Sequence, residues 1–146
     1  MKGNTADVVF DYQGALGLAR RLWALADEVA HVAGQRRELV DSARTNFTGA
    51  YSDQFSSRMG VEGTNLTNVG QGLRNDAMAL ARMWKAAMEE ENRRLYARHV
   101  DDMKNHRNLL QSIGDFFTGF HYPPEPDPVP LPQPPGFAPT AEHVHY

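Results

Sequence analysis

The distribution of proline divides this sequence into two parts. All 9 prolines lie between Pro123 and Pro139, and residues 1–122 contain none. A proline inside a helix costs about 3 kcal/mol, so long helices are possible only before residue 123. The sequence therefore predicts one helical domain, residues 1–122, followed by a disordered, extended, proline-rich tail, residues 123–146. Such a tail is typical of a spacer, although its Pro-Gln-Pro-Pro segment at residues 132–135 also resembles a ligand for an aromatic groove.

The first half of the helical domain carries one apolar stripe. Hydrophobic residues recur every three or four positions, as they do in the seam between paired helices. They are Ala15, Leu18, Leu22, Leu25, Val29 and Val32, and the stripe continues through Leu39 and Ala43. Thr5 or Asp7 is placed to cap the start of this helix. We expect a helix of about forty residues, longer than most helices of globular proteins.

The second half shows the same periodicity. Its stripe contains Phe55, Met59, Leu66, Val69, Leu73, Ala77, Leu80, Trp84 and Ala87. Glycines 60, 63, 70 and 72 either weaken this helix or allow another helix to approach closely, and we favour close packing. A further apolar cluster at residues 109–120 predicts a helical extension to about residue 120.

Between the two stripes, Phe47-Thr48-Gly49 forms the candidate turn motif. Glycine readily adopts the left-handed conformation that ends helices, so we expect an all-α hairpin of two long antiparallel helices. Leu16, Val40, Met83 and Met88 fall outside the main stripes, and Leu39 lies beyond the main seam of residues 15–32, in its continuation. This surplus of apolar residues predicts association with a second hairpin into a four-helix bundle.

The composition argues against several classes of function. The sequence has no cysteine, a net charge of −3 and a pI near 6.0, which disfavour a disulfide framework and a nucleic-acid-binding protein. No apolar run approaches the roughly 20 residues that span a membrane. His99, Asp102 and His106 share one helical face, but an exposed charged face explains them better than a metal site. We assign no catalytic, cofactor-binding or metal-binding residues, and we expect no enzymatic activity.

The turn and its surroundings resemble the WXG family of helical hairpins. Phe47 and Gly49 correspond to the aromatic residue and the glycine of the family motif, and Trp23 precedes them in the first helix. The segments at residues 51–55, 73–77 and 84–87 resemble the continuation of the motif and the second helix. The resemblance implies type VII secretion of the actinobacterial type. It also implies a homo- or heterodimer with another hairpin protein, acting as a secreted substrate or as an escort for one.

The same resemblance implies a route and a set of contact residues. The chain would be cytoplasmic before export, would leave without a cleavable signal peptide, and would meet a component of the secretion machinery. Tyr96 and Asp101 are the candidate remnant of the family's export signal, although the spacing between them is one residue too long. The candidate core or interface residues are Leu18, Leu22, Trp23, Leu25, Val29, Val32, Phe55, Leu66, Val69, Leu73, Leu80 and Trp84.

Two other interpretations remain open at the level of the sequence. The chain could be a helical scaffold subunit of a larger assembly, in which residues 109–120 and the tail dock onto neighbouring chains. It could also be the N-terminal targeting domain of a larger secreted effector. Residues 109–120 contain no Lys or Arg, which disfavours a membrane-surface helix there.

Overall fold

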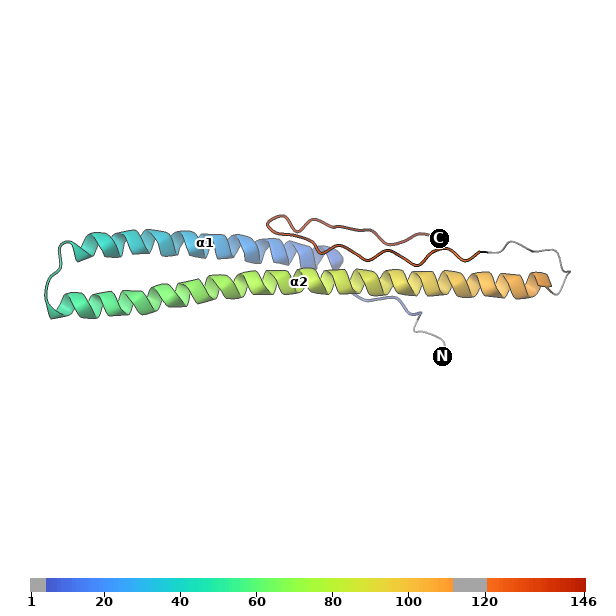
Figure 1. Cartoon of the computed structure of the whole chain (residues 1–146), viewed down its shortest axis with the longest axis horizontal. Helices are drawn as coiled ribbons and strands as arrows, with labels where there is room; N and C mark the ends of the chain where they lie inside the picture. Colours follow the sequence, from blue (N-terminus) through green and yellow to red (C-terminus); the bar gives the residue numbers. More distant parts are fainter. Residues whose placement is uncertain (1–4, 112–120) are drawn as a thin grey trace.

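The computed structural model describes residues 5–111 and 121–146, and these form a helical hairpin with a tail packed along it (Figure 1). Helix α1 spans Tyr12–Arg44, with 33 residues, and α2 spans Ala50–Gln111, with 62 residues. Only helices, turns and extended segments occur among the described residues, which confirms the prediction of an all-α hairpin. The predicted extension of the second helix from residue 112 to 120 lies outside the described residues.

The start of α1 differs from the prediction. Asp11 is the N-cap, and its side chain accepts a hydrogen bond of 2.9 Å from the backbone N–H of Gly14. Asp7 instead pairs with Arg98 of α2 at 2.7 Å. The prediction that Thr5 or Asp7 caps the helix is therefore wrong, and α1 is shorter than expected.

Residues 45–49 connect the two helices and contain the predicted turn motif, Phe47, Thr48 and Gly49. Gly49 has a φ of 90°, which an L-residue with a side chain resists. Phe47 stacks on Phe55 of α2, with ring centroids 6.2 Å apart and an interplanar angle of 16°. This contact joins the last residues of the connection to the first turns of α2.

Small residues line the contact between the two helices. Ala19 and Ala26 of α1 are buried, as are Ala77 and Ala81 of α2. The spacing between packed helices depends on the side chains at the contact, so alanine allows the backbones to approach closely. Gly70 also belongs to this contact, because a Cβ atom there would lie 3.7 Å from Val29 Cγ1 and 3.8 Å from the Ala26 carbonyl oxygen. A Cβ atom on Gly60, Gly63 or Gly72 would meet nothing within 4 Å.

The position of the helix–helix seam was predicted only in part, since Ala77 and Trp84 of the second stripe are buried as expected. Leu16 and Met88, which the periodicity placed outside the seam, are 2% and 4% exposed and belong to the core. Leu18, Leu25, Val32 and Val69, which were assigned to the stripes, are exposed. The contact runs through alanines on one side of the leucine row, so the bulky residues flank the contact instead of filling it.

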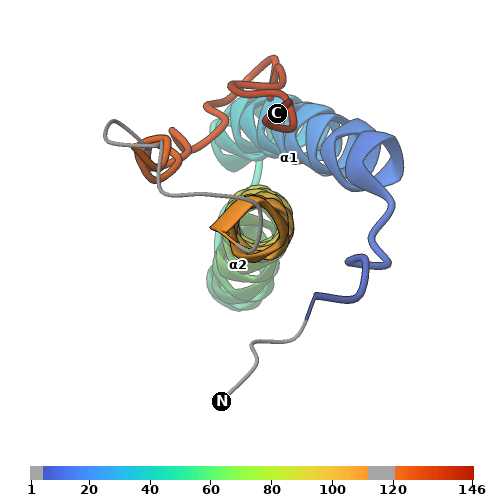
Figure 2. The same ribbon diagram turned by 90° about the vertical axis from the view of Figure 1, so that its right-hand side faces the viewer.

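The tail, residues 121–146, is extended as predicted, but it is not disordered. It runs back along α2, turns over the N-terminal half of α1 and returns (Figure 1), and it lies on the opposite side of the hairpin from the N-terminal segment (Figure 2). Val129 is 3% exposed, Phe137 is 0% exposed, and Pro132 is buried. These side chains fill the groove that the alanine contact leaves beside Leu16, Trp84 and Met88.

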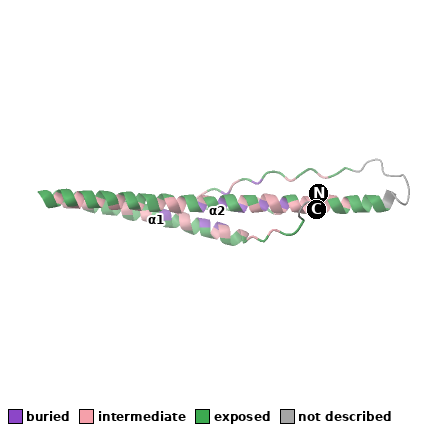
Figure 3. Ribbon diagram, turned by 90° about the horizontal axis from the view of Figure 1, so that it is seen from below, coloured by how far each residue is buried: buried purple, intermediate pink, exposed green. Residues whose placement is uncertain are grey.

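Buried residues gather in the half of the hairpin that the tail covers, whereas the half near the turn is exposed (Figure 3). The helices of the described residues include none that is long and apolar enough to cross a membrane.

Candidate partner interface

The hairpin has two long faces, and the tail covers only one of them. We call the first the tail face, because the tail is fixed there through both helices. The Arg20 side chain donates to the carbonyl oxygens of Gly136 and Phe137, each at 3.4 Å. On α2, Glu89 accepts a hydrogen bond of 3.1 Å from the Val129 N–H.

Aromatic contacts complete the tail face. The Phe137 ring packs edge-on against Trp23, with centroids 5.8 Å apart, and the His143 ring packs against Tyr12 at 5.1 Å. At the C-terminal end of the tail, the Tyr146 ring stacks on the His99 ring, with centroids 4.7 Å apart. His99, considered above as a metal ligand, is therefore part of the surface that holds the tail.

The candidate export residues are also involved with the tail. The Tyr96 hydroxyl donates a hydrogen bond of 3.1 Å to the Pro123 carbonyl, and its ring lies 6.1 Å from that of Tyr146. Asp101 is exposed and lies 4.0 Å from the ammonium group of Lys104. The structure therefore brings Tyr96 together with the tail and not with Asp101.

The second face, which we call the open face, carries a row of exposed apolar residues on α1. Leu18, Leu25, Val32 and Leu39 recur every seven positions, the repeat of a helix that pairs with another helix. Their exposed fractions are 47%, 45%, 45% and 70%. On α2, Val69 and Met83 are 53% and 55% exposed. Leu22, Val29, Leu73 and Leu80 are half-buried, and Leu22 and Leu80 also pack against the core, whereas Leu66 lines the hollow between the helices.

Helical geometry places the exposed apolar residues of both helices on the side of the hairpin away from the tail. Leu18 lies two positions before Arg20, which contacts the tail, and residues two apart point in nearly opposite directions from a helix. Leu80 lies nine positions before Glu89, about two and a half turns of helix, and so it also faces away from the tail. The open face is therefore one continuous surface formed by both helices.

The N-terminal segment covers only the end of the hairpin beyond these rows. The Val8 N–H donates to Glu91 at 2.7 Å, and Arg94 donates to the Ala6 carbonyl at 2.7 Å. Two ion pairs, Arg74–Asp27 at 2.9 Å and Arg36–Glu62 at 2.6 Å, link the helices along the uncovered length. These ion pairs connect α1 to α2 where neither the tail nor the N-terminal segment contacts them.

The two tryptophans serve the fold. Trp84 is 2% exposed at the centre of the core, and Trp23 is half-buried between Phe137 and Arg74, whose guanidinium lies 5.3 Å from its ring centroid. Of the other predicted core or interface residues, Phe55 supports the turn. The exposed leucines and valines form the open face.

The pKa values of several side chains on α1 and α2 are shifted by their surroundings. Hydrogen bonds from Arg93 and Arg94 hold the pKa of Glu90 below its usual value, and a hydrogen bond from Lys85 does the same for Glu89. Burial, together with the nearby charge of Glu91, raises the pKa of Tyr12. Of the two carboxylates, Glu89 contacts the tail and Glu90 pairs with Arg93 and Arg94 of its own helix. Within the described residues no three His, Asp or Glu side chains are grouped to hold a metal ion.

Comparison of the chain with protein-family models, with curated proteins and with solved structures gives no match. The functional argument therefore depends on the two faces themselves.

The sequence did not predict the tail face, because Val129 and Phe137 belong to no periodic hydrophobic pattern. The only signal for it was the presence of these apolar side chains within an otherwise polar and proline-rich segment.

Proposed function

We propose that this protein acts by pairing its open face with a second helical hairpin, as a homo- or heterodimer, to form a four-helix bundle. The observation that carries this proposal is the heptad row Leu18, Leu25, Val32 and Leu39, which is exposed along α1 at the spacing of a helix that pairs with another helix. Exposed apolar rows of this kind mark interaction sites. Full burial of one such side chain contributes about 1.5–3 kcal/mol, so covering the row, together with Val69 and Met83 on α2, offsets part of the entropy lost on association.

The finer proposal follows from the resemblance described above. A WXG-like hairpin pairs with its partner for type VII secretion, as a substrate or as an escort of a substrate. In this role the chain would be made in the cytoplasm and exported without a cleavable signal peptide. The short Phe47-Thr48-Gly49 turn and the two long helices support the proposal, because they match the hairpin that the resemblance implies.

Sedimentation equilibrium on the full chain tests the pairing, alone and with the product of any neighbouring hairpin gene. A variant carrying Leu25→Glu and Val32→Glu should weaken association at least tenfold, because it places two carboxylates within the bundle. Ala24→Glu with His31→Glu is the matched control, since both positions are exposed on α1 and have the same spacing. A monomer at high concentration with every partner tested would contradict the proposal, as would equal weakening by both variants.

Export tests the finer proposal separately. In a host with an active type VII system, the protein should reach the medium, and loss of the secretion ATPase should abolish its export. Retention in the cytoplasm with a dimerising partner present would leave the pairing intact and would contradict the secretion role. The scaffold alternative predicts instead that the tail binds neighbouring chains, but in this structure the tail is bound to its own helices.

A further inference from the structure

The groove that holds the tail continues beyond it towards the hairpin turn. The tail reverses at residues 134–136, and Phe137 contacts Trp23 there. Arg74 lies over the Trp23 ring and also lines the next stretch of the groove. The rest of the groove, between this point and the turn, is covered by no described segment of the chain (Figure 1). We call this stretch the open groove.

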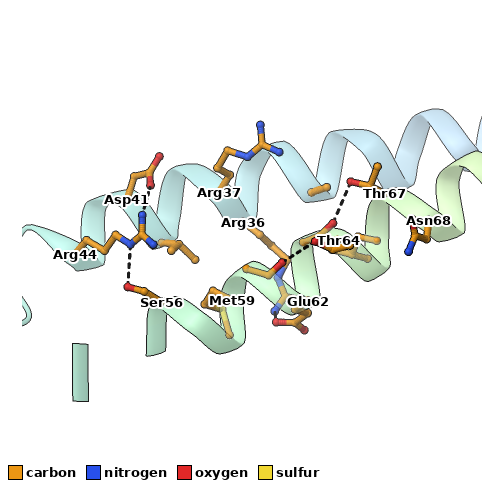
Figure 4. Close-up of a pocket in the computed structure, with 15 residues that line it drawn as sticks. Arg36, Arg37, Asp41, Arg44, Ser56, Met59, Glu62, Thr64, Thr67 and Asn68 are labelled. Atoms are coloured by element: carbon orange, nitrogen blue, oxygen red, sulfur yellow. Dashed lines mark hydrogen bonds and ion pairs between the residues drawn. The ribbon is translucent and has the colours of Figure 1, made fainter. Parts of the chain in front are cut away.

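The open groove consists of two adjoining hollows between α1 and α2. One has a volume of about 250 Å³ and begins at Ala26, Gly70 and Arg74, and the other has a volume of about 450 Å³ and reaches Arg44 and Ser56. They share Ala33, Arg37, Leu66 and Thr67, so they form one channel. Figure 4 shows the larger hollow, with side chains of both helices along its length.

Its lining combines small residues and arginines with the apolar side chains of Val40, Met59 and Leu66. Ala30, Gly34, Gly60 and Gly63 leave room for a backbone to lie close to the helices. Arg36 and Arg44 line the groove, but their charges are paired with Glu62 and Asp41 at 2.6 and 3.8 Å. Arg37 has no ion-pair partner among the described residues, so the groove carries an unbalanced positive charge.

We propose that the open groove binds an extended, proline-rich and acidic segment of a partner protein. The covered half of the same groove is the evidence for the kind of occupant, because an extended proline-rich segment fills it. There, an arginine side chain donates to carbonyl oxygens of the bound segment at 3.4 Å, and Val129 and Phe137 provide apolar anchors.

Arg37 is placed to act in the open half as Arg20 acts in the covered half. Proline-rich segments expose carbonyl oxygens that have no internal hydrogen bonds, so a guanidinium group can bind them. A neighbouring carboxylate on the same segment would balance the charge of Arg37. Such segments also lose little conformational entropy when they bind. This inference does not depend on pairing through the open face, which lies on the other side of the hairpin.

The test uses a labelled synthetic peptide with the sequence of residues 123–132, which is extended, proline-rich and acidic. Binding to the full-length protein is followed by fluorescence anisotropy, and backbone NMR shifts locate the contact. We expect saturable binding that weakens with added salt, with shifts at residues 30–37 and 63–71. A peptide with Lys in place of both acidic residues should bind at least tenfold more weakly.

Two matched pairs of variants locate the site. Gly63→Leu fills the groove, whereas Gly72→Leu makes the same change at a glycine that does not line it, and neither new Cβ atom meets anything within 4 Å. Arg37→Glu is compared with Arg21→Glu, an exposed arginine of α1 outside the groove. We expect Gly63→Leu and Arg37→Glu to weaken binding at least tenfold and their controls to change it less than twofold.

Three outcomes would overturn the proposal. They are the absence of binding at about 1 mM peptide, equal effects of test and control variants, and NMR shifts confined to residues 16–23 and 77–92. The last result would mean that the peptide only exchanges with the protein's own tail. Circular dichroism of each variant shows whether the helices persist, and the charge-reversed peptide tests the same site on the unaltered protein.

Discussion

Phe137 in the tail packs edge-on against Trp23 in α1, with the two ring centroids 5.8 Å apart and an interplanar angle of 69°. Phe137 is 0% exposed, whereas Trp23 is half-buried and bears the Arg74 guanidinium on its ring. A residue near the end of the sequence thus completes a cluster built on the first helix. The tail is therefore part of the folded domain and is not a spacer attached to it.

Phe137→Ala should detach the turn of the tail from the hairpin. Truncation of a fully buried phenylalanine costs about 3–5 kcal/mol, which is a large part of the stability of a typical domain. We expect hydrogen exchange at Val129 and Val144 to rise by at least tenfold, and the Tm to fall by about 10 °C. Val9→Ala is the control, because Val9 is 99% exposed. Unchanged exchange in Phe137→Ala would show that the ring does not hold the tail.

Asn92→Leu should loosen the returning segment of the tail, residues 137–146. Asn92 is buried, with 4% of its surface exposed, and its side-chain oxygen accepts a hydrogen bond of 3.0 Å from the Val144 N–H. Leucine fits a helix but leaves that N–H without an acceptor, which costs about 1–3 kcal/mol. Amide exchange at Val144 should accelerate, and Asn105→Leu, at an exposed position of the same helix, should leave it unchanged. Equal exchange in the two variants would contradict this role.

The hairpin could be predicted from the sequence, and the packing of the tail could not. Helical periodicity and a glycine between two stripes are local signals, and they were enough for two antiparallel helices. The seam was misplaced on α1 because Ala19 and Ala26, like Ala81 on α2, contribute little hydrophobicity beside the leucines, although they decide how closely the helices approach. Val129 and Phe137 bind a groove that exists only after the helices have paired, so no local pattern reports their burial.

Gly49 and Gly34 should respond in opposite directions to alanine. Gly49 has a φ of 90°, where a side chain costs about 1–2 kcal/mol, so Gly49→Ala should lower the free energy of unfolding by this amount. Gly34 lies within α1, and a Cβ atom there meets nothing within 4 Å. Gly34→Ala should therefore raise the free energy of unfolding by about 1 kcal/mol. Urea denaturation followed by circular dichroism measures both, and changes of the same sign would contradict the argument.

Acid should release the tail before it unfolds the helices. The pKa of Glu89 is lowered mainly by the hydrogen bond from Lys85 and further by the Val129 N–H. A carboxyl group with a lowered pKa stabilises the folded state above its unfolded pKa, here about 4.5, and this contribution is lost as the pH falls through the lower folded value. Exchange at Val129 should thus rise below pH 4.5.

Glu89→Gln tests whether this carboxyl group is responsible. The variant keeps a hydrogen-bonding side chain but does not titrate, so its Val129 exchange, corrected for intrinsic rates, should depend less on pH than that of the unaltered protein. Glu28→Gln is the control, because Glu28 is exposed on α1. An unchanged pH profile in Glu89→Gln would assign the acid sensitivity to other groups.

Removal of residues 123–146 should destabilise the hairpin and expose its core. The truncated chain loses Val129, Pro132 and Phe137, which are buried against Leu16 and Trp84. A tail without contacts could be removed at no cost, but these contacts predict a Tm lower by 10 °C or more, on the order of 3 kcal/mol or more. The uncovered side chains should also bind a hydrophobic dye, which would not reach them in the full chain.

A shorter truncation after Pro139 is the matched control for this prediction. It removes the Val144 and Tyr146 contacts but keeps Val129 and Phe137 in the groove, so most of the stability should remain. Differential scanning calorimetry of the three chains, at one protein concentration, separates the contributions. If the chain ending at Tyr122 melted at the same temperature as the full protein and bound no dye, the tail would not be part of the core.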